Sequence, residues 1–168
     1  MTVDELAALD HPSAEDAAWL DSVAPRAQAW YTEQEALLLQ QGRQLSPEEM
    51  EIARRVGVQT PEKVRVVVLK EFPFPGDPAL AKELKSLGFG SPQVGGFTMG
   101  YAILEKPKFK KERWLLAHEL GHVGQRERMG TEAFVRRYLL EMRKVGYVRS
   151  PLEVEANAKM QETMPENN

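Results

Sequence analysis

Apolar side chains recur at helical spacing over the first part of the chain. Ser13 and Ser46 are each followed by acidic residues, which is the pattern of a helix N-cap, because a serine hydroxyl accepts hydrogen bonds from the free amides of the first turn. Pro25 lacks an amide proton, so we expect it to interrupt the first helix and a second helix to span residues 26–41. The pattern predicts a helical region over residues 1–62.

Two short segments in the middle of the chain have the pattern of β-strands. Residues 64–69 are a run of mainly β-branched residues too short for a stable helix, and residues 97–104 form a second segment of this kind. A short helix over residues 79–87 and a glycine-rich loop lie between them. Gly100 and Ala102 leave one face of the second strand open, either to the close approach of another backbone or to a packed helix.

Three further helical segments follow, at residues 110–129, 131–145 and 151–163. With the two strands they predict one α+β domain, in which a small mixed or antiparallel sheet packs against the first of these helices and additional helices lie at the N-terminus. We divide the single domain, residues 1–168, into an acidic helical N-terminal region (1–62), a core (63–163) and a flexible tail (164–168).

The composition excludes several classes of protein. The 168 residues include no cysteine, which rules out disulfide scaffolds, iron–sulfur clusters, zinc ribbons and thiol nucleophiles. No apolar run approaches the roughly 18 residues that a membrane helix needs, and the acidic start of the chain is unlike a secretory signal. We therefore expect a cytoplasmic protein with no membrane partner.

Charge is unevenly distributed along the chain. Residues 1–62 carry a net charge of −8, whereas residues 106–149 carry +7. Either both sets of charges are solvated, or the basic half faces an acidic partner, which could be a substrate or the chain's own N-terminal region. The basic residues are not interleaved with aromatic residues and the pI is about 5.7, so we expect no nucleic-acid partner.

The most informative segment for chemistry is His118-Glu119-Leu120-Gly121-His122. Four residues of a helix advance by about 400°, so His118 and His122 project from one face about one turn apart. Two imidazoles in this arrangement can bind one tetrahedral Zn²⁺ ion. Glu119 lies about 100° further round the helix, where its carboxylate can accept a proton from a water molecule at the metal.

A catalytic zinc ion needs a third protein ligand, and no histidine follows His122. The candidates are Glu153 and Glu155, of which only one can face the metal because they lie about 200° apart on a helix. Glu153 also occupies the position where a capping-box glutamate binds the amide of Ser150. Asn157, however, follows Glu153 by one turn and can hydrogen-bond toward the same site. The residues alone leave the choice open.

The H-E-L-G-H run at residues 118–122, followed by E-V-E-A-N at residues 153–157, resembles the paired motifs of the gluzincin zinc metallopeptidases. The small size is similar to that of the minigluzincins and the ImmA/IrrE-type peptidases. Over residues 96–160 the resemblance implies a zincin-like fold and a bound Zn²⁺ ion. The implied ligands are His118, His122 and Glu153, with Glu155 as the alternative to Glu153, and Glu119 is the implied general base and acid.

The resemblance also implies the reaction and the partner. Peptide bonds would be hydrolysed in an extended protein or peptide substrate, which pairs with an edge strand at residues 97–104. The reaction needs a further hydrogen-bond donor for its oxyanion, and Tyr147 is our candidate, with Arg149 behind it. Two other functions fit the sequence. One is a latent or non-catalytic zinc-binding module that regulates or binds peptides, and the other is a helical interaction domain without a metal.

Overall fold

The computed structural model describes residues 1–91 and 94–164 of the chain. Within these residues, four strands form one mixed sheet in the order β1-β2-β4-β3. The strands β2 and β4 are parallel and the two outer pairs are antiparallel, so β3 is one edge of the sheet. The strands are β1 (Arg43–Gln44), β2 (Arg65–Val68), β3 (Gly96–Met99) and β4 (Ala102–Glu105).

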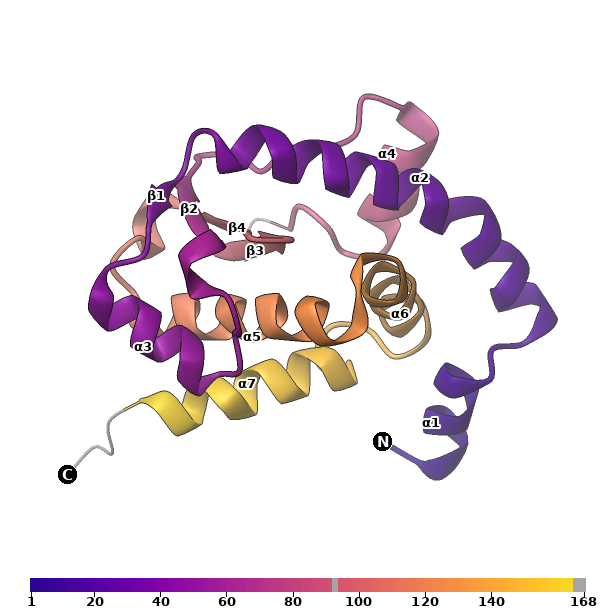
Figure 1. Cartoon of the computed structure of the whole chain (residues 1–168). Helices are drawn as coiled ribbons and strands as arrows, with labels where there is room; N and C mark the ends of the chain where they lie inside the picture. The colour runs from indigo at the N-terminus through magenta and orange to yellow at the C-terminus, as the bar shows by residue number, and fades with distance from the viewer. Residues whose placement is uncertain (92–93, 165–168) are drawn as a thin grey trace.

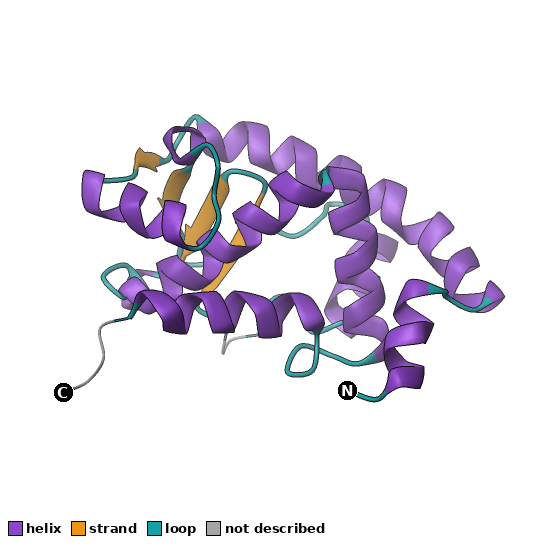
Figure 2. Cartoon of the chain, turned by 60° about the horizontal axis from the view of Figure 1, so that its bottom comes forward, coloured by secondary structure: helices purple, strands orange, loops and turns teal. Residues whose placement is uncertain are grey.

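Helices enclose the sheet on both faces (Figures 1 and 2). Those of the described residues are α1 (Val3–Asp10), α2 (Ala14–Leu39), α3 (Pro47–Arg55), α4 (Pro78–Ser86), α5 (Arg113–Met129), α6 (Thr131–Lys144) and α7 (Pro151–Thr163). Helices α2 and α4 cover one face, α3 and α5 cover the other, and α7 lies on the outer side of α5 (Figure 1). The predicted α+β domain, with a mixed sheet packed against the helix that carries both histidines, is confirmed.

Alternating side chains of the central strands build two cores. Val67 of β2 and Leu104 of β4 belong to the core formed with α2, α4 and α6. Their neighbours Val66 and Ile103 point to the opposite face, where they pack with residues of α3 and α5 such as Leu120. Helix α5 is thereby held under the sheet, in contact with the edge strand β3.

The segment 97–104, predicted as one strand, is a hairpin of β3 and β4 joined by a two-residue turn. Gly100 opens this turn with a φ of +63°, a conformation that side chains other than glycine rarely adopt. A β-carbon on Gly100 would overlap the carboxylate of Glu35, because α2 packs against the turn. Of the two alternatives for Gly100 and Ala102, the packed helix is therefore the one observed. The prediction of a single strand was wrong because the apolar pattern continues through the turn.

Pro25 does not interrupt the first long helix, since α2 runs unbroken from Ala14 to Leu39. A proline inside a helix costs about 3 kcal/mol. Pro25 is exposed, and the opposite side of α2 buries large side chains, including Leu20, Tyr31 and Leu38. Each of these contributes roughly 1.5–3 kcal/mol on burial, which together outweighs the cost of the proline.

The acidic and basic halves of the chain pair with each other. Helix α6 supplies the cations and the first two helices supply the anions. The pairs are Arg136–Asp21 at 2.9 Å, Arg137–Asp10 at 2.7 Å, and Arg143–Asp16 and Lys144–Asp16 at 3.0 Å. A hydrogen bond to Lys144 lowers the pKa of Asp16 from its usual value, although burial opposes this. The basic residues of α6 thus pair with the chain's own N-terminal region.

Among the described residues, no helix has both the length and the apolar character that a membrane crossing requires. The predicted tail 164–168 lies outside the described residues apart from Met164, as do residues 92–93 of the glycine-rich loop. The internal boundaries at residues 62 and 163 stay a prediction.

Candidate metal centre

Helix α5 carries both histidines and is enclosed through its middle. Every residue from 115 to 125 is buried, because α5 lies between the sheet and α7 (Figure 1). A helix covered on opposite sides does not need a polar face, which accounts for the apolar residues on either side of the first histidine. His118 and His122 project one turn apart, with ring centroids separated by 4.9 Å.

Three ligand atoms from two helices meet at one point. Nε2 of His118 lies 3.2 Å from Nε2 of His122. The carboxylate oxygens of Glu153, on α7, lie 2.9 Å from the His118 nitrogen and 3.2 Å from the His122 nitrogen. Atoms bound at 2.0–2.1 Å to a tetrahedral zinc ion are about 3.3 Å apart. These three buried residues therefore form a group that could hold a metal ion.

The Glu153 carboxylate gives independent support for a cation. Its Oε2 atom is buried, and among the described residues no hydrogen-bond donor is directed at it, although Nε2 of His118 lies only 2.9 Å away. Leaving a buried polar atom without a partner costs about 1–3 kcal/mol, and more for a charged group. A cation between the three side chains would satisfy this oxygen and both ring nitrogens.

Without a metal, the same side chains form a tightly coupled ion pair. Burial opposes protonation of His122, but its hydrogen bond to Glu153 and the nearby carboxylate charges raise its pKa to about 9. Burial alone would raise the pKa of Glu153, yet the two imidazoles hold it well below its usual range. Metal binding must therefore displace the proton from His122.

We expect the metal-free protein to become less stable as the pH rises toward about 9. The pKa of His122 is raised from 6.5 to about 9 by folding, so its protonation stabilises the fold fully below pH 6.5 and this contribution is lost as the pH passes through 9. Urea unfolding of the chelator-treated protein measures the effect. The His122→Gln variant should lose this pH dependence, and a wild-type profile as flat as that of the variant would contradict the assignment.

The start of α7 is held so that its first turn delivers Glu153. The hydroxyl of Ser150 accepts a hydrogen bond from the Glu153 amide at 3.3 Å and donates one to Glu141 at 2.7 Å. Glu141, on α6, also accepts from the amide of Leu152 at 2.9 Å and is fully buried. Ser150 is therefore a helix cap, as the sequence predicts, while the Glu153 side chain turns to the histidines instead of completing a capping box.

Helices α5 and α7 approach each other closely at Gly121. A β-carbon at this position would lie 3.3 Å from both Cα and Cβ of Ala156, which is tighter than ordinary van der Waals contact. The glycine between the two histidines thus lets α7 come near enough for Glu153 to reach both imidazoles.

Two further side chains orient the ligands. Tyr138 of α6 donates a hydrogen bond to Oε1 of Glu153 at 2.7 Å. Oε1 of Gln125 lies 2.8 Å from Nδ1 of His122, and the Gln125 amide donates to the carbonyl of Leu152 at 2.8 Å. Neither residue was identified from the sequence. Gln125 follows His122 by three positions and could have been found from helical spacing, whereas no spacing indicates Tyr138.

Replacing Gln125 with leucine should lower the affinity for Zn²⁺ by about 10- to 100-fold, because the Nδ1 proton of His122 loses its acceptor and the ring is no longer held in place. Competition with a chromogenic chelator measures this affinity. Gln161, which is exposed near the end of α7, provides the matched control Gln161→Leu, which should bind zinc like the wild type. Equal affinities for all three proteins would remove Gln125 from the site.

Glu119 lies beside the three ligand residues, against the edge strand β3. The hydroxyl of Thr98 donates to Oε2 of Glu119 at 2.5 Å. A β-carbon on Gly96 would lie 3.0 Å from the other carboxylate oxygen, so this glycine leaves room for the Glu119 side chain. Neither Thr98 nor Gly96 was identified from the sequence as a neighbour of Glu119, because only the strand register places them next to α5.

Of the two other residues that the sequence predicts, Tyr147 lies at the site and Arg149 does not. Tyr147 precedes α7 and lines the same cavity as Glu119 and Glu153. Burial, followed by the charges of these two carboxylates, raises the pKa of Tyr147. Arg149 does not stand behind Tyr147 toward the site but pairs with Glu5 of α1 at 2.7 Å.

Glu155, the alternative third ligand, points away from the histidines. Its carboxylate lies 2.5 Å from Nη2 of Arg128 and 3.3 Å from the amide nitrogen of Gln125. Asn157, expected to bond toward the site, is exposed. The role expected of Asn157 beside the ligands is filled by Gln125.

A cavity of about 540 Å³ opens beside the metal-binding group. His122, Glu153, Glu119 and Tyr147 contribute to its wall. The rest of the described wall is mainly apolar and comes from α2, the loop at residues 72–74, α4 and the loop that follows it, β3, the start of α5, and α6. Two of the three residues of the metal-binding group, His122 and Glu153, therefore face a cavity large enough for a ligand.

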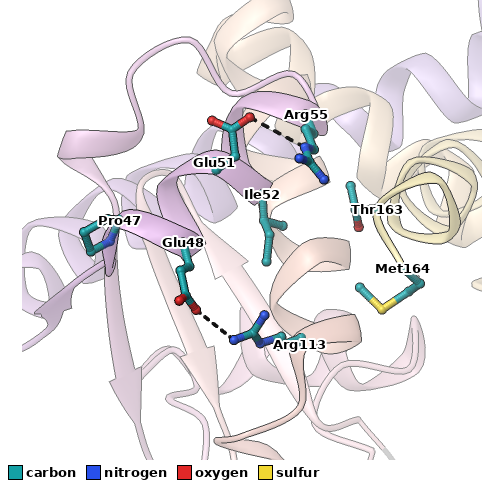
Figure 3. Close-up of a pocket in the computed structure, with 8 residues that line it drawn as sticks. All are labelled: Pro47, Glu48, Glu51, Ile52, Arg55, Arg113, Thr163 and Met164. Carbon is teal, nitrogen blue, oxygen red and sulfur yellow. Dashed lines mark hydrogen bonds and ion pairs between the residues drawn. The ribbon is translucent and has the colours of Figure 1, made fainter.

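A second hollow, of about 520 Å³, lies between α3, the start of α5 and the end of α7 (Figure 3). Its charged side chains are paired with each other. Glu48 lies 2.9 Å from Arg113, and Glu51 lies 3.6 Å from Arg55. Among the described residues that line it, this hollow presents no group of side chains with evident chemistry.

Comparison with known proteins finds no match. The chain matches no known protein family, no curated protein and no solved structure. Its function is therefore inferred from the site itself, in which two histidines and one glutamate could hold a metal ion at the wall of an apolar cavity.

Proposed function

We propose that this protein is a zinc-dependent peptidase of the gluzincin type. The observation that carries the proposal is the convergence of His118, His122 and Glu153 on one point, with Glu119 beside them but outside the ligand group. Two histidines and one carboxylate are a donor set of catalytic zinc sites that keep a position open. A neighbouring carboxylate that is not a ligand has the place of a general base.

Zinc is the metal that the donors favour. Imidazole nitrogens suit zinc, copper, iron and nickel, whereas magnesium and calcium prefer sites made of oxygen atoms. Two of the three donor atoms here are Nε2 atoms, and their spacing agrees with tetrahedral bonds of zinc length.

When bound, zinc supplies a Lewis acid that polarises the substrate carbonyl and lowers the pKa of water toward 7. Glu119 accepts a proton from the attacking water while the water oxygen bonds to the substrate carbonyl carbon. It then donates that proton to the leaving amine nitrogen as the C–N bond breaks. One water is consumed, and a carboxylic acid and an amine are released. The Thr98 hydroxyl holds Oε2 of Glu119, which leaves Oε1 for the proton.

Tyr147 is the proposed donor to the carbonyl oxygen. A tyrosine phenol is protonated at neutral pH, so it can donate a hydrogen bond to a developing oxyanion. It lines the cavity together with Glu119 and Glu153, which supports this role.

The substrate is an extended segment of a protein or peptide. Strand β3 is an edge of the sheet, and its residues Phe97 and Thr98 line the cavity next to Glu119. An extended peptide can add to such an edge by backbone hydrogen bonds, which would bring its carbonyl groups past the metal-binding group.

The zinc-loaded protein should hydrolyse an unfolded protein substrate, 1,10-phenanthroline should stop the reaction, and one equivalent of Zn²⁺ should restore it. Elemental analysis of the same sample gives the metal content. If the protein holds one zinc ion per chain but cleaves no unfolded protein, its function is that of a non-catalytic zinc-binding module and not that of a peptidase. No zinc after reconstitution would leave a helical interaction domain.

A further inference from the structure

We infer that the lysine loop, residues 106–112 between β4 and α5, binds an acidic segment of the polypeptide substrate a few residues away from the scissile bond. This inference rests on the proposed peptidase function and adds a property of its substrate. It follows from which cations of the chain already have a partner, and from where the lysine loop meets the edge strand β3.

The arginines of the molecule are nearly all used in ion pairs. Among the described residues, every arginine except Arg65 pairs with a carboxylate, and Arg65 donates to backbone carbonyls instead. Lys144 of α6 pairs with Asp16 in the same way. The cations of α6 therefore have their acidic partner within the chain, and a search for an outside partner turns to the rest of the basic half.

The lysine loop carries charge that the fold does not neutralise. It contains four lysines and one glutamate. Lys108, Lys110 and Lys111 are exposed, and within the described part of the chain none of them has a carboxylate partner. The glutamate, Glu112, accepts a hydrogen bond from the indole of Trp114 at 3.2 Å. Like charges gathered in so few residues repel one another, and an anionic segment bound to them relieves this repulsion.

The lysine loop starts at one end of the edge strand. The amide of Lys106 donates to the carbonyl of Gly95, one residue before β3, at 2.9 Å. A β-carbon on Gly95 would lie 2.7 Å from the ring of Phe109, so the loop packs directly on the chain that enters β3. Phe109 meets Trp114 edge-to-face at 6.1 Å, and Trp114 lines the cavity beside the metal-binding group. The loop thus borders the path proposed for the substrate, which favours the substrate itself as its acidic partner.

The opposite end of β3 has a different charge. There the hairpin turn is held by Glu35, which accepts from the amide of Tyr101 at 2.6 Å, and the Tyr101 hydroxyl donates to Glu127 at 2.9 Å. Arg126 is paired with Glu35 at 3.1 Å, and Lys63 lies over the ring of Tyr101 at 5.6 Å. Two carboxylates face one unpaired cation at this end, so an acidic segment gains from only one end of the strand.

The spacing along β3 gives the position of the acidic segment. Thr98 contacts Glu119, and Gly95, which contacts the lysine loop, lies three residues before Thr98. A peptide added beside β3 advances by the same rise, about 3.3 Å per residue. The acidic side chains should therefore begin about three residues from the scissile bond, on one side of it. Exposed ion pairs are individually weak, so three of them should raise kcat/KM by about 10-fold at low salt.

Internally quenched peptides test this preference. Three peptides share one core, taken from a site cleaved in the unfolded protein substrate, and carry three glutamates before it, three glutamates after it, or glutamines on both sides. For the zinc-loaded protein, one glutamate peptide should be cleaved about 10-fold faster than the glutamine peptide at low salt and less than about twofold faster in about 0.5 M NaCl. Equal rates for all three peptides, or equal acceleration by both flanks, would overturn the inference.

A triple variant with a matched control places the effect in the lysine loop. The variant combines Lys108→Gln, Lys110→Gln and Lys111→Gln. The ratio of kcat/KM between the preferred glutamate peptide and the glutamine peptide should fall from about 10 to about 1. The control removes three lysines outside the loop that also lack a carboxylate partner among the described residues, namely Lys63→Gln, Lys82→Gln and Lys159→Gln. It should keep the wild-type ratio, and an equal loss in both variants would show that net charge alone attracts the peptide and would overturn the inference. Zinc content and thermal unfolding check both folds.

Binding to zinc-loaded Glu119→Gln separates failure of the loop from failure of the peptidase. If the wild type cleaves no peptide, but this variant binds one glutamate peptide about tenfold more tightly than the glutamine peptide and loses the preference when the three loop lysines are replaced, the loop assignment stands and the peptidase does not. Cleavage that is indifferent to the glutamates would keep the peptidase and overturn the loop assignment. Sedimentation with phosphatidylserine vesicles that the lysine variant loses, together with equal rates for all peptides, would assign the loop to a membrane surface and overturn the inference.

Discussion

Replacing Glu119 with glutamine should abolish peptide hydrolysis while leaving the fold and the zinc content unchanged. Glutamine has nearly the same size, and its amide oxygen can still accept the hydrogen bond from Thr98. It cannot, however, accept a proton from the attacking water. General base and acid catalysis contributes about 10²- to 10⁴-fold, so kcat should fall by at least that range.

The matched control is Glu155→Gln, the same exchange at a carboxylate that lies outside the cavity and pairs with Arg128. It should retain wild-type kcat and one zinc ion per chain. Both variants are assayed with the same unfolded substrate, and zinc is measured on the assayed samples. Normal cleavage by Glu119→Gln would remove Glu119 from the mechanism even if the protein remains a zinc enzyme.

Replacing Glu153 with alanine should remove the metal. Two imidazoles remain, but the negatively charged ligand is gone and Tyr138 loses its acceptor. Loss of a residue that merely orients a ligand already lowers metal affinity by about 10- to 100-fold, so loss of the ligand itself should exceed about 100-fold. Elemental analysis after dialysis should find one zinc ion per chain in the wild type and almost none in Glu153→Ala.

The Glu155→Ala variant is the control for the assignment of Glu153 as the third metal ligand. It stands two residues away on α7 and should keep its zinc, since its carboxylate is directed at Arg128. Zinc retained in Glu153→Ala and lost in Glu155→Ala would show that the third ligand is wrongly assigned. Zinc lost in both would point to a fold that depends on the charge of this turn, which the thermal unfolding curves of the two variants would reveal.

The part of the candidate site that lies on one helix could be predicted from the sequence. The spacing of His118 and His122 within a helix determines that they share a face, whatever surrounds them. The residues leave the third ligand open, because Glu153 has a local role as a capping residue that competes with a role at the site. In the structure the Ser150 amide donates to the carbonyl of Tyr147 at 3.3 Å, which leaves the Glu153 side chain free to face the histidines. Glu141 accepts from the Ser150 hydroxyl and the Leu152 amide, and nothing in the sequence connects it with α7.

The remaining features depend on contacts between distant elements. Thr98 reaches Glu119 only because the hairpin places alternate residues of β3 on α5, and the sequence pattern did not resolve the hairpin. The continuity of α2 through Pro25 likewise depends on burial against the sheet. Local preference predicted a break there, and tertiary packing overrode it.

The enclosure of α5 has a consequence for how the molecule fluctuates. Its residues 115–125 are all buried, so this helix can open only when the layers on both sides of it separate, which places it among the last parts of the structure to unfold. Part of the cavity wall, in contrast, comes from a loop in which Gly88 and Gly90 are exposed, and such segments open locally at low cost. The two histidine ligands thus lie on one of the most enclosed elements of the chain, whereas the cavity wall includes a loop that opens easily, so the wall can adjust to different occupants without disturbing the geometry of the two imidazoles.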